Sequence, residues 1–232
     1  MNKKELSYRE RWGLFPSIFA SLYECLRSGL GLRTYGIHTR PVAAPSGPDP
    51  EVEGVSFRLF KKGDAEALIA SARLPELDLP EHFVREALEK DDICDAVLCD
   101  GSIVSYSWTA FTQTHDDDGV FVGFGKEYGY GYKAFTLPDY RGRHLLRFAR
   151  PRRDRYFIES GRCTHLIAFI GLSNRSSVRF THAMGYRRAG TAGYFKRGSW
   201  FWAFRSPGAK RCGFCFFLPL RSANEDNDRG SS

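Results

Sequence analysis

Short runs of alternating apolar and polar residues, separated by longer runs typical of helices, predict a mixed α/β domain over residues 55–220. The predicted strands cover residues 55–60, 96–99, 103–111, a long region ending at Leu137, 165–170, 190–196 and parts of the aromatic-rich segment 199–219. The predicted helices cover residues 64–72, 80–90 and the segments after Gly142 and Asn174. This order predicts a central, mostly antiparallel sheet flanked by helices.

Two local features refine this pattern. Asp100 and Gly101 are a favoured pair for a tight turn, so the strands on either side of them are predicted to form a hairpin. Pro151 falls inside the helix that follows Gly142, where a proline removes a hydrogen bond and clashes with the preceding turn. Two alternatives follow: one kinked helix, or a short helix ending near Ala149 and a second one beginning with Pro151.

Residues 1–40 are expected to form a basic, aromatic helical arm. A proline at position 16 suits a first helical turn, and one helical face after it is apolar. That face consists of Ile18, Phe19, Leu22, Tyr23 and Leu26. It either covers the domain's own core, which the sequence favours, or docks on a membrane surface or a partner subunit.

Two further segments lie outside the predicted domain. Residues 41–54 carry four prolines and no apolar period, as a linker does. Residues 221–232 are polar and are expected to be a disordered tail.

The charge of the chain indicates an anionic partner. Lysine and arginine number 34 against 27 acidic residues, which gives a net charge of +7. Coenzyme A, an acidic membrane surface and nucleic acid all fit such a charge. No secretory signal or spanning run is evident, so the expected location is the cytoplasm, with peripheral membrane association as the alternative.

The cysteines do not indicate a disulfide framework or a metal site. Six cysteines are scattered along the chain, which favours reduced thiols. Cys212 and Cys215 form a C-x-x-C pair, but a zinc ribbon needs a second pair and the sequence has none. No metal is therefore predicted.

The candidate chemistry centres on residues 137–146, LPDYRGRHLL. A strand stops at Pro138 and a helix is predicted after Gly142, so backbone N–H groups at a helix start are free to bind an anion. Arginines crowd the same region, from Arg141 and Arg143 onward, in numbers that suit several phosphates. A solvated basic helix face is the simpler alternative, and the glycine turn directly before the helix favours phosphate binding over it.

The predicted elements follow a fixed order: a strand, this turn, a helix, a second strand, a helix that begins at Asn174, and the pair Gly185-Tyr186. This order resembles that of the GNAT superfamily, the acetyl-coenzyme A-dependent N-acetyltransferases. The resemblance covers the chain from Tyr132 to Gly185. It implies a GNAT-like fold and acetyl-CoA, or another acyl-CoA, as co-substrate. The cofactor-binding residues that it implies are Phe135, Thr136, Leu137, Arg141, Gly142, Arg143, His144, Leu145, Leu146 and Asn174.

Three positions depart from the family's pattern. Asp139 replaces the first Gln or Arg of the cofactor turn, and His144 replaces its final small residue. Thr181 stands where these enzymes often have a tyrosine acid. These departures keep open a catalytically silent module that binds an acyl-CoA or a partner. The net charge of +7 and the aromatic, basic arm keep open a protein that binds anionic surfaces or nucleic acid, of which nucleic acid is disfavoured.

Direct attack of an amine on a thioester needs a base for the ammonium proton. Tyr132 and Glu127 are the candidates, because they lie on or before the strand that would face the acceptor. Tyr128, Tyr130 and Tyr132 alternate with glycines and share one face, which either cradles a sugar or is ordinary core. The predicted function is acyl transfer from coenzyme A to a primary amine, with an amino sugar as the preferred acceptor.

Overall fold

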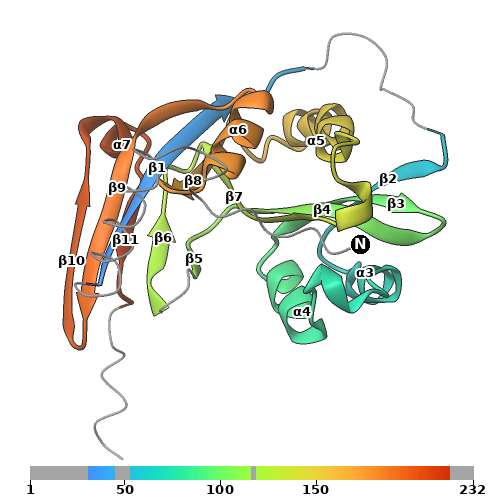
Figure 1. Ribbon diagram of the computed structural model, residues 1–232, viewed down its shortest axis with the longest axis horizontal. Helices are drawn as coiled ribbons and strands as arrows, with labels where there is room; N and C mark the ends of the chain where they lie inside the picture. Colours follow the sequence, from blue (N-terminus) through green and yellow to red (C-terminus); the bar gives the residue numbers. More distant parts are fainter. Residues whose placement is uncertain (1–30, 45–52, 116–118, 220–232) are drawn as a thin grey trace, which may run out of the picture.

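The computed structural model of the protein describes residues 31–44, 53–115 and 119–219 (Figure 1). Eight strands form the larger of two sheets: β1 (Leu32–Pro41), β2 (Val55–Phe60), β3 (Ile93–Cys99), β4 (Ser102–Ala110), β7 (Tyr128–Thr136), β8 (His165–Gly171), β9 (Arg187–Arg197) and β10 (Trp200–Arg205). Three short strands form the smaller one: β5 (Thr114–His115), β6 (Phe121–Gly123) and β11 (Cys215–Phe217). The helices are α3 (Ala65–Ser71), α4 (Glu81–Glu89), α5 (Leu145–Ser160), α6 (Arg175–Ala183) and α7 (Pro207–Arg211).

The strand order in the large sheet is β10-β9-β1-β8-β7-β4-β3-β2. Every neighbouring pair is antiparallel except β7 and β8, which are parallel. Helices α5 and α6 lie on one face of this sheet, and α3 and α4 cover the opposite face of its β2–β4 half (Figure 1). The structure thus confirms a mixed α/β fold with a mostly antiparallel sheet flanked by helices.

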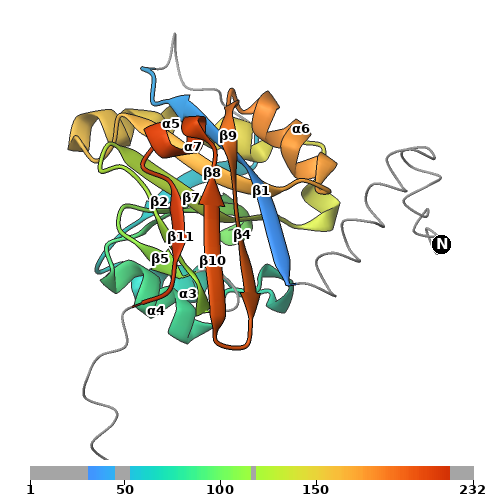
Figure 2. The same ribbon diagram turned by 90° about the vertical axis from the view of Figure 1, so that its left-hand side faces the viewer.

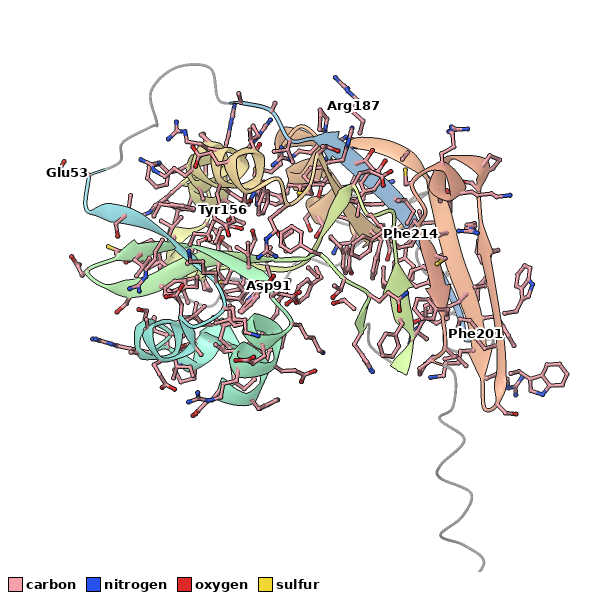
Figure 3. The ribbon with its side chains drawn as sticks, turned by 180° about the vertical axis from the view of Figure 1, so that it is seen from behind. Glu53, Asp91, Tyr156, Arg187, Phe201 and Phe214 are labelled. Atoms are coloured by element: carbon pink, nitrogen blue, oxygen red, sulfur yellow. The ribbon has the colours of Figure 1, made fainter. Side chains whose placement is uncertain are left out.

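The small sheet packs against the other half of the large one. Figure 2 views the molecule from the β10 edge, with β11 beside it. The apolar side chains between the two sheets include Ile37 from β1, Val122 from β6 and Phe214, all fully buried. Phe214 is labelled in Figure 3. A second core lies around β2, β3 and β4, where Trp108 and Leu68 are fully buried. Each half of the large sheet therefore packs on an apolar core, and Tyr132 contacts both cores.

The expectation of a helical arm over residues 1–40 is wrong for residues 32–40, which form most of β1 in the interior of the sheet. Threonines, Tyr35 and Ile37 in this segment favour a strand. β1 pairs with β8 on one side and with β9 on the other, so the domain includes residues before the proline-rich segment. The apolar face between Ile18 and Leu26, most of the linker and the tail at 221–232 lie outside the described residues.

Several local predictions are confirmed. The expected hairpin between β3 and β4 has its turn at Asp100 and Gly101. Their φ angles of 49° and 75° lie in the left-handed region, as tight hairpin turns require. The helices expected at 64–72 and 80–90 are α3 and α4. Pro151 lies within one continuous helix, α5, which decides between the two alternatives for that segment.

Two predicted segments contain more elements than the sequence pattern indicated. The long strand region that ends at Leu137 is two strands, β6 and β7. The aromatic segment 199–219 contains α7 between β10 and β11. The signal for this helix was present, because Ser206 caps it by accepting a hydrogen bond from the N–H of Ala209 and Pro207 occupies its first turn.

A buried ion pair joins β1 to α5. Arg40 donates from Nη1 and Nη2 to the two carboxylate oxygens of Asp154, at 2.7 and 2.6 Å, and both side chains are almost fully buried. Residues 114 positions apart in the sequence are thereby held in one bidentate contact. Removing one partner from such a pair leaves an unpaired charge in the interior.

We expect Asp154→Asn to lower the free energy of unfolding by about 3–5 kcal/mol, because Arg40 would keep its charge without a carboxylate. Urea denaturation of the two proteins measures the difference. The matched control is Glu81→Gln, which breaks the exposed ion pair with Arg85 and should cost under about 1 kcal/mol. Equal losses in the two variants would contradict a structural role for the buried pair.

Candidate functional site

The central feature of the site is the early end of the pairing between β7 and β8. The two strands pair over Tyr128–Tyr130 and His165–Ile167 only. Beyond this point β7 continues along β4 as far as Thr136, and β8 continues along β1 as far as Gly171. Each strand therefore has an edge that faces a gap instead of a neighbouring strand. Such an edge can pair with an extended ligand through its backbone N–H and C=O groups.

The gap is a cavity of about 540 Å³, a size typical of small-molecule sites. It is lined by β4, β7 and β8 together with the start of α5 and one face of α6. Its apolar and aromatic lining includes Trp108, Tyr132, Phe135, Phe169, Ile170, Phe180, Met184 and Tyr186. A long, largely apolar arm fits this lining better than a compact charged ligand does.

The turn before α5 has the backbone of an anion site. Gly142 and His144 have positive φ angles of 81° and 57°, whereas the φ angle of Arg143 between them is not positive. The backbone conformation therefore alternates between left-handed and ordinary values over these three residues. Within the described residues, none of the N–H groups from Gly142 to Leu146 donates to a carbonyl, and no side chain caps the helix. Such turns at a helix start bind phosphate groups, and the helix dipole adds to the effect.

Two exposed arginines flank this turn. Arg141 lines the cavity and donates from Nε to the carbonyl of Thr136 at 3.1 Å, with its guanidinium 5.8 Å from the Phe135 ring centre. Arg143 lies 4.9 Å from the ring centre of Tyr140. These contacts hold Arg141 at the cavity and Arg143 in the adjoining turn, where both can meet a phosphate bound at the turn.

Helix α6 reaches the cavity through the cap that Asn174 provides. The Oδ1 atom of Asn174 accepts hydrogen bonds from the N–H of Ser177 at 3.1 Å and from the hydroxyl of Ser176 at 3.0 Å. Ser176 and Ser177 line the cavity, whereas Asn174 does not. The side chain of Asn174 thus positions the start of α6 and does not itself line the cavity.

The structure divides the ten expected cofactor residues into four groups. Those that line the cavity are Phe135, Thr136, Arg141 and Leu146. Those in the turn beside it are Gly142, Arg143 and His144, and Asn174 caps α6. Leu137 and Leu145 are buried in the core around β2, β3 and β4, where they hold the strand end and the helix start in place.

Tyr132 lines the cavity and is joined to a buried carboxyl group. Its hydroxyl donates to Oδ2 of Asp92 at 3.0 Å, and Asp92 is only 3% exposed. Burial raises the pKa of Asp92 to about 7, although the hydrogen bond from Tyr132 opposes the rise. Burial and the neighbouring Asp92 also raise the pKa of Tyr132 well above its usual value. The pair can therefore accept a proton near neutral pH through Asp92.

Sequence reasoning missed Asp92. It follows Asp91 directly, but Asp91 is half-exposed and pairs with Arg162 at 2.6 Å, which lowers the pKa of Asp91 (Figure 3). Only the fold makes the two neighbours chemically different. A polar residue at the start of a buried strand was the one available signal.

Tyr132 is also an irregular residue of β7. The register between β4 and β7 shifts between Trp108 and Thr109, which pair with Lys133 and Gly131. Tyr132 is the extra residue of this bulge, and it also lies beyond the last pair with β8. Bulges of this kind redirect side chains and free backbone groups next to active sites.

The other expected residues lie elsewhere. Glu127 is exposed, precedes β7 and does not line the cavity, so the structure does not bring it together with Tyr132. The tyrosines that were expected to share one face of the strand have different surroundings. Tyr130 is buried and stacks on Phe169 with ring centres 5.6 Å apart, whereas Tyr132 lines the cavity. Thr181 lines the cavity as a buried residue.

Neither a metal cluster nor a spanning helix is found in the part of the chain that the structure describes. Residues 31–44, 53–115 and 119–219 contain no group of three or more histidine, cysteine or acidic side chains placed to hold a metal ion. No helix in these ranges is both long and apolar enough to cross a membrane.

No protein-family model and no curated protein sequence matches the chain. Solved structures that are similar to it include the aminoglycoside acetyltransferase AAC(6')-Iy with a bisubstrate analogue, at 17% identity over 58% of this chain and 91% of that one, with a TM-score of 0.44. A tandem GNAT protein from the clavulanic acid biosynthesis pathway matches at 10% identity over 79% and 58% of the two chains, with a TM-score of 0.46. A GNAT-family acetyltransferase from Novosphingobium aromaticivorans matches at 17% identity over 71% and 63%, with a TM-score of 0.44. At such low identities and TM-scores, these likenesses decide neither the family nor the activity of this chain.

Proposed function

We propose that the protein is an N-acyltransferase that moves an acetyl or other acyl group from a coenzyme A thioester to a primary amine. The observation that carries this proposal is the gap between β7 and β8. It opens at a phosphate-type turn, continues along a free strand edge and reaches a buried phenol–carboxyl pair. Coenzyme A thioesters present a phosphate end, an amide-bearing arm and a reactive carbonyl in the same order.

The donor would be held in two places. The N–H groups from Gly142 to Leu146, with Arg141 and Arg143, would bind the pyrophosphate. The arm carries amide groups, and these would pair with the free edge of β7 between Ala134 and Thr136, as a peptide pairs with an open sheet edge. These two contacts fix the thioester carbonyl deeper in the gap.

The reaction needs one proton acceptor and one proton donor. Tyr132 would take the proton of the substrate ammonium while it passes its own proton to Asp92. The neutral nitrogen then attacks the thioester carbonyl, the carbon–sulfur bond breaks, and an amide forms. Tyr186, which also lines the cavity, would protonate the departing thiolate and would recover a proton from the nitrogen, which loses its second proton as the amide forms.

The bulge at Tyr132 supports the same step. Its backbone lies outside the pairing with both β4 and β8, beside the cavity. An N–H group there would stabilise the negative charge that develops on the carbonyl oxygen during attack.

Among amines, an amino sugar is the acceptor class we propose, because Tyr132, Phe169 and Phe180 give the cavity flat apolar surfaces beside its polar groups.

We expect acetyl-CoA at about 100 times its dissociation constant to stabilise the protein by about 2.7 kcal/mol. The double variant Arg141→Ala, Arg143→Ala should lose most of this stabilisation, because it removes the two cations that flank the turn before α5. Thermal unfolding with and without ligand measures both. The matched control is Lys210→Ala, Arg211→Ala on α7, which removes the same charge from exposed positions that do not line the cavity.

The same experiment separates the alternatives. Absence of any shift in the wild type would contradict coenzyme A binding, and tight binding to anionic vesicles instead would favour the surface-binding alternative. Stabilisation without release of free thiol across a panel of amines would indicate a catalytically silent module.

We expect Asp92→Asn to lower kcat/KM by about 10²–10⁴-fold and to abolish the rise of kcat/KM with pH that the wild type shows through about pH 7. The reason is that only the ionised Asp92 can accept the proton passed by Tyr132. Steady-state rates between pH 5.5 and 8.5 test this. Asp91→Asn is the matched control, since Asp91 is half-exposed and pairs with Arg162. Retention of the wild-type pH profile by Asp92→Asn would exclude Asp92 as the acceptor.

The raised pKa of Asp92 also predicts a change in stability with pH. The native state holds a proton on Asp92 up to about pH 7, whereas the unfolded chain releases it near pH 4, so the native state binds more protons between these values. The contribution of Asp92 to stability is therefore present at low pH and is lost as the pH rises to about 7, by about 1.4 kcal/mol for each unit of pKa difference. Urea unfolding at several pH values should show this slope in the wild type and in Asp91→Asn, and a flatter one in Asp92→Asn.

A further inference from the structure

The middle of α5 places an arginine in the cavity with part of its guanidinium unused. Arg153 is 5% exposed and lines the cavity. Its Nη1 donates to the hydroxyl of Ser107 at 3.2 Å and to Oδ1 of Asp95 at 3.4 Å. Its Nε lies 3.7 Å from Oδ1 of Asp154, beyond hydrogen-bond distance, and neither Nε nor Nη2 has a hydrogen-bond partner among the described residues.

The charges around Arg153 do not balance. The guanidinium groups of Arg40, Arg150 and Arg153 meet the carboxyl groups of Asp95 and Asp154, which makes three positive groups against two negative ones. Arg40 already engages both oxygens of Asp154. A buried cation without a full partner is costly, so an anion that enters the cavity would complete the cluster.

The position of Arg153 indicates which part of a bound donor it would meet. Arg153 lies eight residues after the start of α5 at Leu145, so it is about 12 Å along the helix from the phosphate-type turn. It contacts Ser107 on β4, and Thr109 and Gly131, which lie next to the last paired residues of β7 and β8, also line the cavity. A donor whose phosphates bind at the turn would have its acyl group at this end of the cavity.

Arg153 and the proton-accepting pair lie on opposite faces of the sheet. Tyr132 packs toward α4, with its ring 6.4 Å from that of Phe83, whereas Arg153 belongs to α5 on the other face (Figure 1). The acceptor amine must lie near Tyr132 to lose its proton. The anion that meets Arg153 is therefore carried by the donor rather than by the acceptor.

We propose that Arg153 binds a carboxylate at the far end of the acyl group, so that the preferred donor is a coenzyme A thioester of a short dicarboxylic acid. Nε and Nη2 form one edge of the guanidinium, and an arginine edge binds the two oxygens of a carboxylate side by side. This inference rests on the proposed acyl transfer and adds the chemical class of the acyl group to it.

The first test compares four ligands on the full-length wild-type protein by calorimetry: coenzyme A, acetyl-CoA, butyryl-CoA and succinyl-CoA. The butyryl and succinyl groups have the same chain length and differ in the terminal carboxylate. We expect succinyl-CoA to bind at least about 10-fold more tightly than butyryl-CoA, as suits a charge-assisted hydrogen-bonded pair.

The outcomes separate this inference from the proposed function. Equal affinities for butyryl-CoA and succinyl-CoA would overturn the role of Arg153 and leave coenzyme A binding intact. Binding of none of the four ligands would overturn the proposed function itself. Equal affinities together with faster turnover of carboxylate-bearing amines than of their amides would also overturn the inference, because the carboxylate would then belong to the acceptor.

Variants at position 153 give an independent test. Arg153→Lys keeps the charge but loses the planar edge, and Arg153→Met removes the charge. Each should reduce the preference for succinyl-CoA over butyryl-CoA while affinity for coenzyme A stays within a few-fold. Arg58→Lys, an exposed position on β2 that does not line the cavity, should keep the wild-type preference. Because the wild-type comparison needs no variant, the inference stays testable even if a substitution at Arg153 prevents folding.

Discussion

β7 and β8 pair over only three residues each, and the groups that can bind or react in this protein gather where that pairing stops. Parallel strands in an ordinary sheet would continue side by side and use their backbone groups on each other. Here β7 follows β4 and β8 follows β1, so each strand keeps one full ladder and frees one edge. Both strands therefore stay hydrogen-bonded in the sheet although they separate from each other, and the separation creates a cavity in the middle of the sheet.

Two sets of contacts keep the gap open. Stacking of Tyr130 on Phe169 fills the sheet just below the gap with apolar rings. Above it, the Arg40–Asp154 pair ties β1, and with it β8, to α5, which packs over β3 and β4. A buried bidentate ion pair tolerates little displacement, since a small movement leaves charge without a partner. The charge cluster that holds the fold is thus continuous with Arg153, which faces the cavity.

The two faces of the sheet divide the chemistry. α5 and α6 present two helix starts, arginines and hydroxyl groups, which suit an anionic donor. The opposite face presents Tyr132 and Asp92, of which the carboxyl group titrates near neutral pH. The gap between β7 and β8 is lined by groups of both kinds, so in the proposed reaction the donor and the acceptor would meet there.

Local sequence determined the elements whose signals are local. Asp100-Gly101 specified a hairpin, Asn174 a helix start, and Gly142 a turn that needs a positive φ, because each of these depends on a few neighbouring backbone angles. The tertiary structure alone decided that β1 enters the sheet, that Asp92 is buried while Asp91 is not, and that Arg153 faces a cavity. Those outcomes depend on burial and on partners far away in the chain, such as Asp154 for Arg40, and no local pattern of residues carries that information.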